Sequence, residues 1–226
     1  MKFFRSLLFI LLLSLCRPEI PASNPHAVSD SSDECVRTIL FVGDSMTGWL
    51  AERLNAYGEA NGFTVMAEIW DGSTIRKWGA DNYLAHAVAR YNPDAVFVSL
   101  GLNELFETNP EKRLRKSMDS IKKAIGDVPV IWIGPLSWPG KNMGNNLNSW
   151  LADEMGEGHY FDSFGLSLSR QGKNNPHPTR EASIKWMDAV VGWLQTDGAI
   201  KLPGYESPAG EKTHRPKVFN YRRMKR

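Results

Sequence analysis

The sequence alternates between short apolar runs and longer amphipathic stretches, and this alternation is the feature that most constrains the fold. The apolar runs are rich in β-branched and aromatic residues, whereas the stretches between them repeat their apolar positions with helical spacing. Strands are expected over residues 38–42, 63–70, 95–100, 128–133 and 159–161, and helices over residues 47–60, 80–91, 110–125, 146–155 and 179–195. Strands that are apolar throughout and separated by helices predict a doubly wound α/β fold, in which helices cover both faces of a mostly parallel sheet.

Length and composition fit one globular domain, which we place at residues 37–200. The chain has 226 residues, of which 42% are hydrophobic and 23% are charged. These values exclude wholesale disorder, a collagen-like repeat and a polytopic membrane protein. The sequence contains no cluster with metal-ligand spacing and no specific nucleic-acid motif, so we predict neither a metal nor another cofactor.

The N-terminus predicts export. Lys2 and Arg5 precede an apolar run at residues 7–13, which is shorter than the roughly 20 residues that a membrane-spanning helix needs. This pattern is typical of a secretory signal, here residues 1–22, followed by a polar linker over residues 23–36. The alternative is a lipoprotein signal that ends at residue 15, with a lipid anchor on Cys16. A periplasmic or secreted location is therefore expected.

The C-terminus is strongly basic. The net charge of the whole chain is +2, of which residues 1–17 contribute +3 and residues 211–226 contribute +6, so residues 18–210 carry −7. With Pro216, many cations and few apolar residues, residues 201–226 are expected to form a disordered tail. Such a tail suits an anionic polymer or a membrane surface, and it suits equally a solvated end without a partner.

Candidate functional residues follow the predicted strands. In a parallel sheet the loops after the carboxyl ends of the strands meet at one edge, where ligands bind. Ser45 ends the tripeptide Gly43-Asp44-Ser45 directly after the first strand, at the turn into a helix. At such a turn the hydroxyl of a serine can act as a nucleophile, and its backbone N–H can donate to an oxyanion. It is equally typical of a helix N-cap, so this residue alone leaves both interpretations open.

Three further residues follow other strands or precede the last helix. Gly72 and Asn103 come after the second and third strands, and His177 stands between Pro176 and Pro178. A glycine N–H and an asparagine amide can face an oxyanion, and two prolines fix the backbone that carries the histidine. Each residue also has a structural interpretation, as a turn glycine, as an asparagine that satisfies loop backbone and as an exposed loop histidine.

Gly-Asp-Ser, a glycine, Gly-x-Asn and a late histidine, in this order at separate loops, resemble the SGNH (GDSL) hydrolase family. The resemblance spans roughly residues 38–195 and implies a flavodoxin-like three-layer sandwich. It implies that Ser45 is the nucleophile and that His177 is the general base. It further implies that the oxyanion donors are the N–H groups of Ser45 and Gly72 and the side chain of Asn103.

The chain departs from the family pattern at the acid of the triad. The expected Asp-x-x-His reads Asn-Asn-Pro-His over residues 174–177, so Asn174 takes the place of the aspartate. An asparagine can accept a hydrogen bond from the histidine, but it supplies no charge to stabilise imidazolium. Three outcomes stay open: a Ser–His dyad oriented by Asn174 or a backbone carbonyl, a substitute carboxylate at Asp162 or Glu104, or loss of catalysis with the cleft retained.

The functional prediction is an exported serine esterase without a cofactor, acting on a small-molecule or polysaccharide ester. The preferred substrate is an O-acylated carbohydrate, with acetyl as the expected acyl group. Trp78 and Trp138 are the candidate substrate-binding residues, because aromatic rings near the catalytic edge can stack on sugar faces, although most tryptophans pack in cores. The alternative is a catalytically impaired or inactive carbohydrate-binding protein of the same fold.

Overall fold

The computed structural model describes residues 36–141 and 145–223, so the predicted signal and nearly all of the linker lie outside the described residues. One sheet of six parallel strands runs through the described part, in the order β5-β4-β3-β1-β2-β6. The strands are β1 (Thr38–Gly43), β2 (Thr64–Asp71), β3 (Ala95–Ser99), β4 (Val130–Ile133), β5 (Tyr160–Phe161) and β6 (Val218–Arg223). The predicted doubly wound α/β fold is confirmed.

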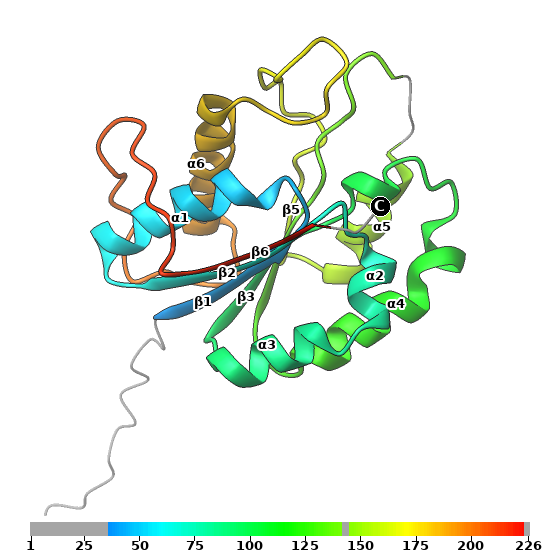
Figure 1. Ribbon diagram of the computed structural model, residues 1–226, viewed down its shortest axis with the longest axis horizontal. Coiled ribbons are helices and arrows are strands. Elements are labelled where there is room, and N and C mark those ends of the chain that lie inside the picture. Colours follow the sequence, from blue (N-terminus) through cyan, green and yellow to red (C-terminus); the bar gives the residue numbers. More distant parts are fainter. Residues whose placement is uncertain (1–35, 142–144, 224–226) are drawn as a thin grey trace, which may run out of the picture. The chain divides into compact units, whose positions relative to one another are not determined.

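Helices cover both faces of this sheet (Figure 1). One face carries α1 (Thr47–Asn61) and α6 (Arg180–Thr196), which contact each other. The other carries α3 (Tyr83–Tyr91) and α4 (Pro110–Ile125), with α2 (Ile75–Ala80) and α5 (Asn146–Met155) packed against α4. None of these helices, over the part of the chain that the structure describes, is long and apolar enough to cross a membrane.

The expected helix over residues 80–91 corresponds to α3, and a separate short helix that the sequence did not predict, α2, precedes it. The Thr74 hydroxyl caps α2 by accepting the N–H of Lys77, so helical structure begins earlier than the pattern suggested. Asp81 then interrupts it in an extended conformation, and its carboxylate accepts the N–H of Tyr83 at the start of α3. Short polar side chains that bind nearby backbone favour such a break over a continuous helix.

The central strands explain where the loops of interest meet. β1 lies between β2 and β3, and Gly43 at its end pairs with Ile69 in β2 and with Ser99 in β3. β3, β4 and β5 are added on the far side of β1 from β2, so the strand order reverses beside β1. In a sheet of this kind ligands bind at that reversal, outside the carboxyl ends of the strands.

The prediction of a disordered C-terminal tail is wrong for residues 201–223, and the domain does not end at residue 200. β6 pairs with β2 in parallel, from Met66 opposite Val218 to Asp71 opposite Arg223. Arg215 stacks its guanidinium 4.3 Å from the ring centre of Phe219. The alternation of aromatic and polar residues over residues 219–222 is the available sequence signal, and the surrounding cations obscure it.

A buried arginine anchors the segment before β6. Arg53 on α1 is 1% exposed. Its guanidinium forms an ion pair with Asp188 on α6 at 2.7 Å and donates to the carbonyl oxygens of Gly210 and Lys212 at 3.0 and 2.8 Å. A buried charge is stable only when paired and hydrogen-bonded, so the folded position of residues 210–212 is tied to that of α1.

A buried carboxylate anchors β6 from the opposite face of the sheet. Glu68 on β2 is 1% exposed and accepts hydrogen bonds from the hydroxyls of Tyr83 and Tyr91 and from the amide of Asn220. The guanidinium of Arg222 lies 3.6 Å from the ring centre of Tyr83. β6 is therefore held by side chains on both faces as well as by its pairing with β2.

We expect Arg53→Ala to lower the free energy of unfolding by about 3 kcal/mol, because it removes the cation that pairs with Asp188 and the donor to two carbonyl groups. Arg113→Ala is the matched control, since Arg113 forms an exposed pair with Glu107 and such pairs contribute about 0–1 kcal/mol. Urea unfolding measures both effects, and hydrogen exchange should increase in β6 only for Arg53→Ala. Equal effects of the two substitutions would contradict the anchoring role.

Candidate active site

Ser45 stands in the turn between β1 and α1, and a close approach of backbone fixes that turn. A Cβ atom on Gly43 would lie 2.0 Å from the hydroxyl of Thr47 and 2.4 Å from the carbonyl oxygen of Ser99. Only glycine fits there, because a side chain would force neighbouring backbone apart. α1 begins at Thr47 with Met46 as its N-cap, so Ser45 is not the helix cap that the sequence left open.

The hydroxyl of Ser45 is hydrogen-bonded to the ring of His177, with 2.8 Å between Oγ and Nε2. His177 belongs to the loop before α6, in which its carbonyl accepts the N–H of Gln171. Arg170 donates from the same loop to the carbonyls of Pro176 and Ser137, at 2.9 and 3.0 Å. These contacts hold the imidazole at the carboxyl end of β1.

Asn175 orients the imidazole. Its Oδ1 lies 2.9 Å from His177 Nδ1 and accepts the backbone N–H of His177 at 3.0 Å. Because a backbone N–H can only donate, the atom that it meets must be the amide oxygen, and Nδ1 must then carry the ring proton. Nε2 is left unprotonated toward Ser45, which is the tautomer that a general base requires.

The prediction that Asn174 takes the acid's place is therefore wrong by one residue. Asn174 is exposed, and its backbone carbonyl accepts the indole N–H of Trp138 at 3.1 Å. The Asp-x-x-His spacing of the family pattern indicated Asn174, whereas in this chain the residue two positions before His177 turns its side chain back onto the ring. Local backbone geometry decided between the two asparagines.

Neither substitute carboxylate contacts the imidazole. Asp162 accepts the N–H of Phe164, and Glu104 is buried, where it accepts the N–H of Arg76.

Burial lowers the pKa of His177 below its usual 6.5, the charge of Asp71 raises it, and Arg170 lowers it. Asp71, at the end of β2, is therefore the acid that acts on the imidazole through its charge, and sequence reasoning had not singled it out.

The three predicted oxyanion donors lie on adjoining loops. The amide of Asn103 in η1 (Leu102–Glu104) donates to the Ser73 carbonyl at 2.7 Å, next to Gly72, and lies 3.4 Å from Asp44 Oδ2, next to Ser45. Gly72 has φ +70°, a left-handed conformation that favours glycine. Within the described residues no hydrogen bond occupies the N–H of Ser45 or of Gly72.

Asp44 beside Ser45 is a buried acid. Burial raises its pKa to about 7, the N–H of Met46 lowers it, and the charges of Glu104 and Asp71 raise it. Burial also raises the pKa of Glu104. Burial, with a smaller contribution from the neighbouring carboxylates, therefore brings the pKa of Asp44 into the neutral range.

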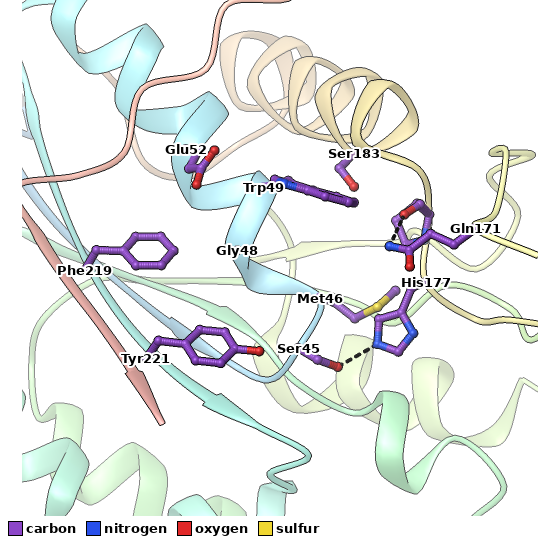
Figure 2. A pocket seen from close by; sticks show the side chains of 11 residues that line it. Ser45, Met46, Gly48, Trp49, Glu52, Gln171, His177, Ser183, Phe219 and Tyr221 are labelled. Atoms are coloured by element: carbon purple, nitrogen blue, oxygen red, sulfur yellow. Dashed lines mark hydrogen bonds between the residues drawn. The ribbon is translucent and has the colours of Figure 1, made fainter. Parts of the chain in front are cut away.

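A pocket of about 290 Å³ opens beside Ser45 and His177 (Figure 2). Trp49 and Glu52 line it from α1, and Phe219 and Tyr221 line it from β6. The segment that the sequence predicted to be disordered thus forms one wall of the site. Sequence reasoning missed Phe219 and Tyr221 for that reason.

The two predicted substrate tryptophans have different positions. Trp78 is 1% exposed, and its indole N–H donates to the Ser73 hydroxyl, so its prediction as a substrate-binding residue is wrong because core packing covers the ring. Trp138 is half-buried and lies 5.6 Å, centre to centre, from the ring of Phe106, which is 54% exposed. Phe106 and Trp138 form an aromatic surface at the edge that carries Asn103.

No group of three His, Cys, Asp or Glu residues within 36–141 and 145–223 is arranged to hold a metal ion. The arrangement of Ser45, His177 and Asn175 suits proton transfer from a hydroxyl to an imidazole, which is the first requirement of nucleophilic catalysis by serine. The free N–H groups beside it suit an oxyanion.

No protein-family model and no curated protein matches this sequence. Solved structures match it in fold. The psychrotrophic esterase EstA from Pseudoalteromonas sp. is 17% identical, with a TM-score of 0.54 over 71% of this chain and 100% of that chain. BT4096, a gut microbial diltiazem-metabolizing enzyme, is 11% identical, with a TM-score of 0.50 over 71% of this chain and 47% of that chain.

These likenesses define the class of fold. The sheet of parallel strands with helices on both faces is the SGNH-hydrolase fold that the sequence resemblance predicted. At these levels of identity the likeness extends to the fold alone, so what the site does depends on its own residues.

We expect His177 to titrate with a midpoint below 6.5, because burial penalises the charged imidazolium. Asn175→Asp should raise that midpoint, since a carboxylate bonded to Nδ1 stabilises the imidazolium. Asn174→Asp is the control and should shift it much less, because the exposed Asn174 side chain does not contact the ring. NMR titration of the imidazole measures all three proteins, and an equal shift in both variants would contradict the assignment of Asn175.

Proposed function

We propose that this chain is an exported serine esterase that hydrolyses an O-acylated substrate. The observation that carries the proposal is the hydrogen-bonded chain from Ser45 through His177 to Asn175. The fold shared with the esterase EstA, whose structure is described as inhibited by monoethylphosphonate, supports the same reaction class. Export rests on the basic and apolar N-terminal segment of the sequence.

The proposed reaction has two steps, acylation of Ser45 and hydrolysis of the acyl–serine. Ser45 Oγ attacks the ester carbonyl carbon while its proton moves to His177 Nε2, and the carbonyl oxygen becomes an oxyanion. When the carbon–oxygen bond to the alcohol breaks, the alcohol takes that proton from Nε2. Water then attacks the acyl–serine carbonyl, giving its proton to His177, and the acid leaves as Ser45 recovers its proton.

The donors around Ser45 would stabilise the oxyanion. The N–H groups of Ser45 and Gly72 and the amide of Asn103 are the candidates, and removal of one such donor typically costs about 10²–10³ in turnover. The Asn103 amide donates one hydrogen to the Ser73 carbonyl at 2.7 Å and the other to Asp44 Oδ2 at 3.4 Å, so it would reach an oxyanion by exchanging the longer of these two bonds. The N–H groups of Ser45 and Gly72 need no such exchange, because no hydrogen bond within the described residues occupies them, and preorganised donors favour the transition state.

The alcohol part of the substrate is proposed to be a carbohydrate. Phe106 and Trp138 support this, because an exposed aromatic surface can stack on the apolar face of a sugar ring. The surface lies beside the loop of Asn174, whose carbonyl accepts the indole N–H of Trp138. A substrate bound there would extend from the surface toward Ser45.

Purified protein should hydrolyse p-nitrophenyl acetate, and Ser45→Ala should reduce kcat by at least about 10³, because the nucleophile is lost. A fluorophosphonate probe should label Ser45 in the native chain and leave Ser45→Ala unlabelled. Equal rates for the two proteins would contradict the esterase. Absence of labelling together with glycan binding would favour the alternative, a non-catalytic carbohydrate-binding protein, and the uncharged Asn175 would then explain the lost activity.

Asn175→Asp should raise kcat at pH 8 by about tenfold or more, because the new charge stabilises the imidazolium formed during attack. The substitution keeps an acceptor for both the ring and the backbone N–H of His177. Asn174→Asp should leave kcat within about twofold. Kinetics across pH 5–9 compare the proteins, and a large fall for Asn175→Asp would mean that the amide has a role of its own.

A further inference from the structure

The pocket beside Ser45 has two walls from distant parts of the sequence. Trp49 projects from α1, and Phe219 and Tyr221 project from β6 toward the same space, as Figure 2 shows. Phe219 is level with Ala67 and Tyr221 with Ile69 in the sheet. Two residues apart on one strand, their rings stand on the same face, which is the face that α1 covers.

Strand pairing fixes the backbone of this wall, and a cation holds the ring of Phe219. Pairing of β6 with β2 fixes the backbone of Phe219 and Tyr221, and Arg215 stacks on the Phe219 ring at 4.3 Å. Arg215 is not one of the residues that line the pocket, so its cation supports the wall without occupying the space. Preorganised rings bind a flat group at little entropic cost.

Gly48 keeps the pocket open on the α1 side. It lines the pocket, and a Cβ atom built on it would meet nothing within 4 Å. Its φ is not in the left-handed region, so neither backbone conformation nor close packing requires glycine at this position. Glycine also disfavours a helix relative to alanine. Glycine therefore leaves space free at the pocket wall, and a large side chain at this position is expected to reduce the pocket.

We infer that this pocket binds an aromatic ring carried by the ester, and that Gly48, Phe219 and Tyr221 set this specificity. The inference rests on the proposed esterase function and extends it to a substrate class. Aromatic rings favour aromatic partners in edge-to-face or offset stacks, which contribute about 0.5–1.5 kcal/mol beyond burial. A volume of about 290 Å³ suits one ring with short substituents, since drug-sized ligands need roughly 300–1,000 Å³. Glu52 adds an acceptor for a ring hydroxyl.

Because the proposed alcohol is a carbohydrate, the ring is expected on the acyl part of the ester, and matched substrates test this placement against the alcohol part. Ethyl benzoate places the ring on the acyl side and benzyl acetate on the alcohol side, with ethyl acetate as the reference without a ring. Ethyl cyclohexanecarboxylate and cyclohexylmethyl acetate have similar bulk without aromaticity. We expect kcat/KM to favour one aromatic ester over its cyclohexyl analogue by about 3- to 10-fold.

Gly48→Leu should fill the pocket and lower the ratio of kcat/KM for the preferred aromatic ester over ethyl acetate by roughly 10- to 100-fold. Gly192→Leu is the matched control, because Gly192 is a helical glycine of α6 whose Cβ position is also open and which does not line the pocket. It should leave the ratio unchanged. Tyr221→Ala should lower the ratio as well, by removing a wall rather than filling the space.

The test of the aromatic pocket can fail independently of the test of the proposed esterase activity. Equal ratios for native protein, Gly48→Leu and Gly192→Leu would overturn the inference while leaving ester hydrolysis intact. If no ester is hydrolysed, Ser45→Ala is titrated with benzyl alcohol and with cyclohexylmethanol, followed by NMR at the Gly48 amide. Saturable shifts that are stronger with benzyl alcohol would uphold the aromatic pocket, and their absence would overturn it.

Discussion

The geometry of this site depends on one oxygen atom, Oδ1 of Asn175, which meets both the backbone N–H and the ring of His177. The backbone N–H determines that the amide presents its oxygen, and the oxygen determines that Nδ1 carries the proton. An asparagine free to rotate could offer its NH₂ group instead and select the other tautomer. The neutral residue therefore orients the imidazole without the charge that an aspartate would add, and the remaining electrostatics must come from elsewhere.

The acids around the site divide into two roles. Asp71 acts on His177 through space and favours the imidazolium, while burial and Arg170 oppose it. Asp44 is buried next to Ser45, and burial with the charges of Glu104 and Asp71 brings its pKa to about 7. Asp44 thus has a pKa raised by its own burial, whereas Asp71 is the acid whose charge raises the pKa of His177.

The C-terminal segment links stability to specificity. Arg53 binds residues 210–212 from one side of the sheet and Glu68 binds Asn220 from the other. Both anchors are buried charged groups, and contacts with this segment supply part of the hydrogen bonding that offsets their desolvation. The same segment presents Phe219 and Tyr221 to the pocket, so the contacts that fold it also form one wall of the site.

The sequence by itself determined the fold class and the residues that meet at Ser45. Buried strands must be apolar, helices must repeat their apolar positions, and parallel strands bring their terminal loops to one edge, which predicted the fold. The resemblance of the motifs to the SGNH family then indicated Ser45, Gly72, Asn103 and His177 as the site residues. The choice between Asn174 and Asn175 depended on a turn of the backbone that spacing does not encode. The burial of Trp78 and the order of residues 201–223 depended on partners far away in the chain. Periodicity shows which face of an element is apolar. Only the tertiary structure brings Arg53 and Glu68 to the C-terminal segment, and so places β6 as one wall of the pocket.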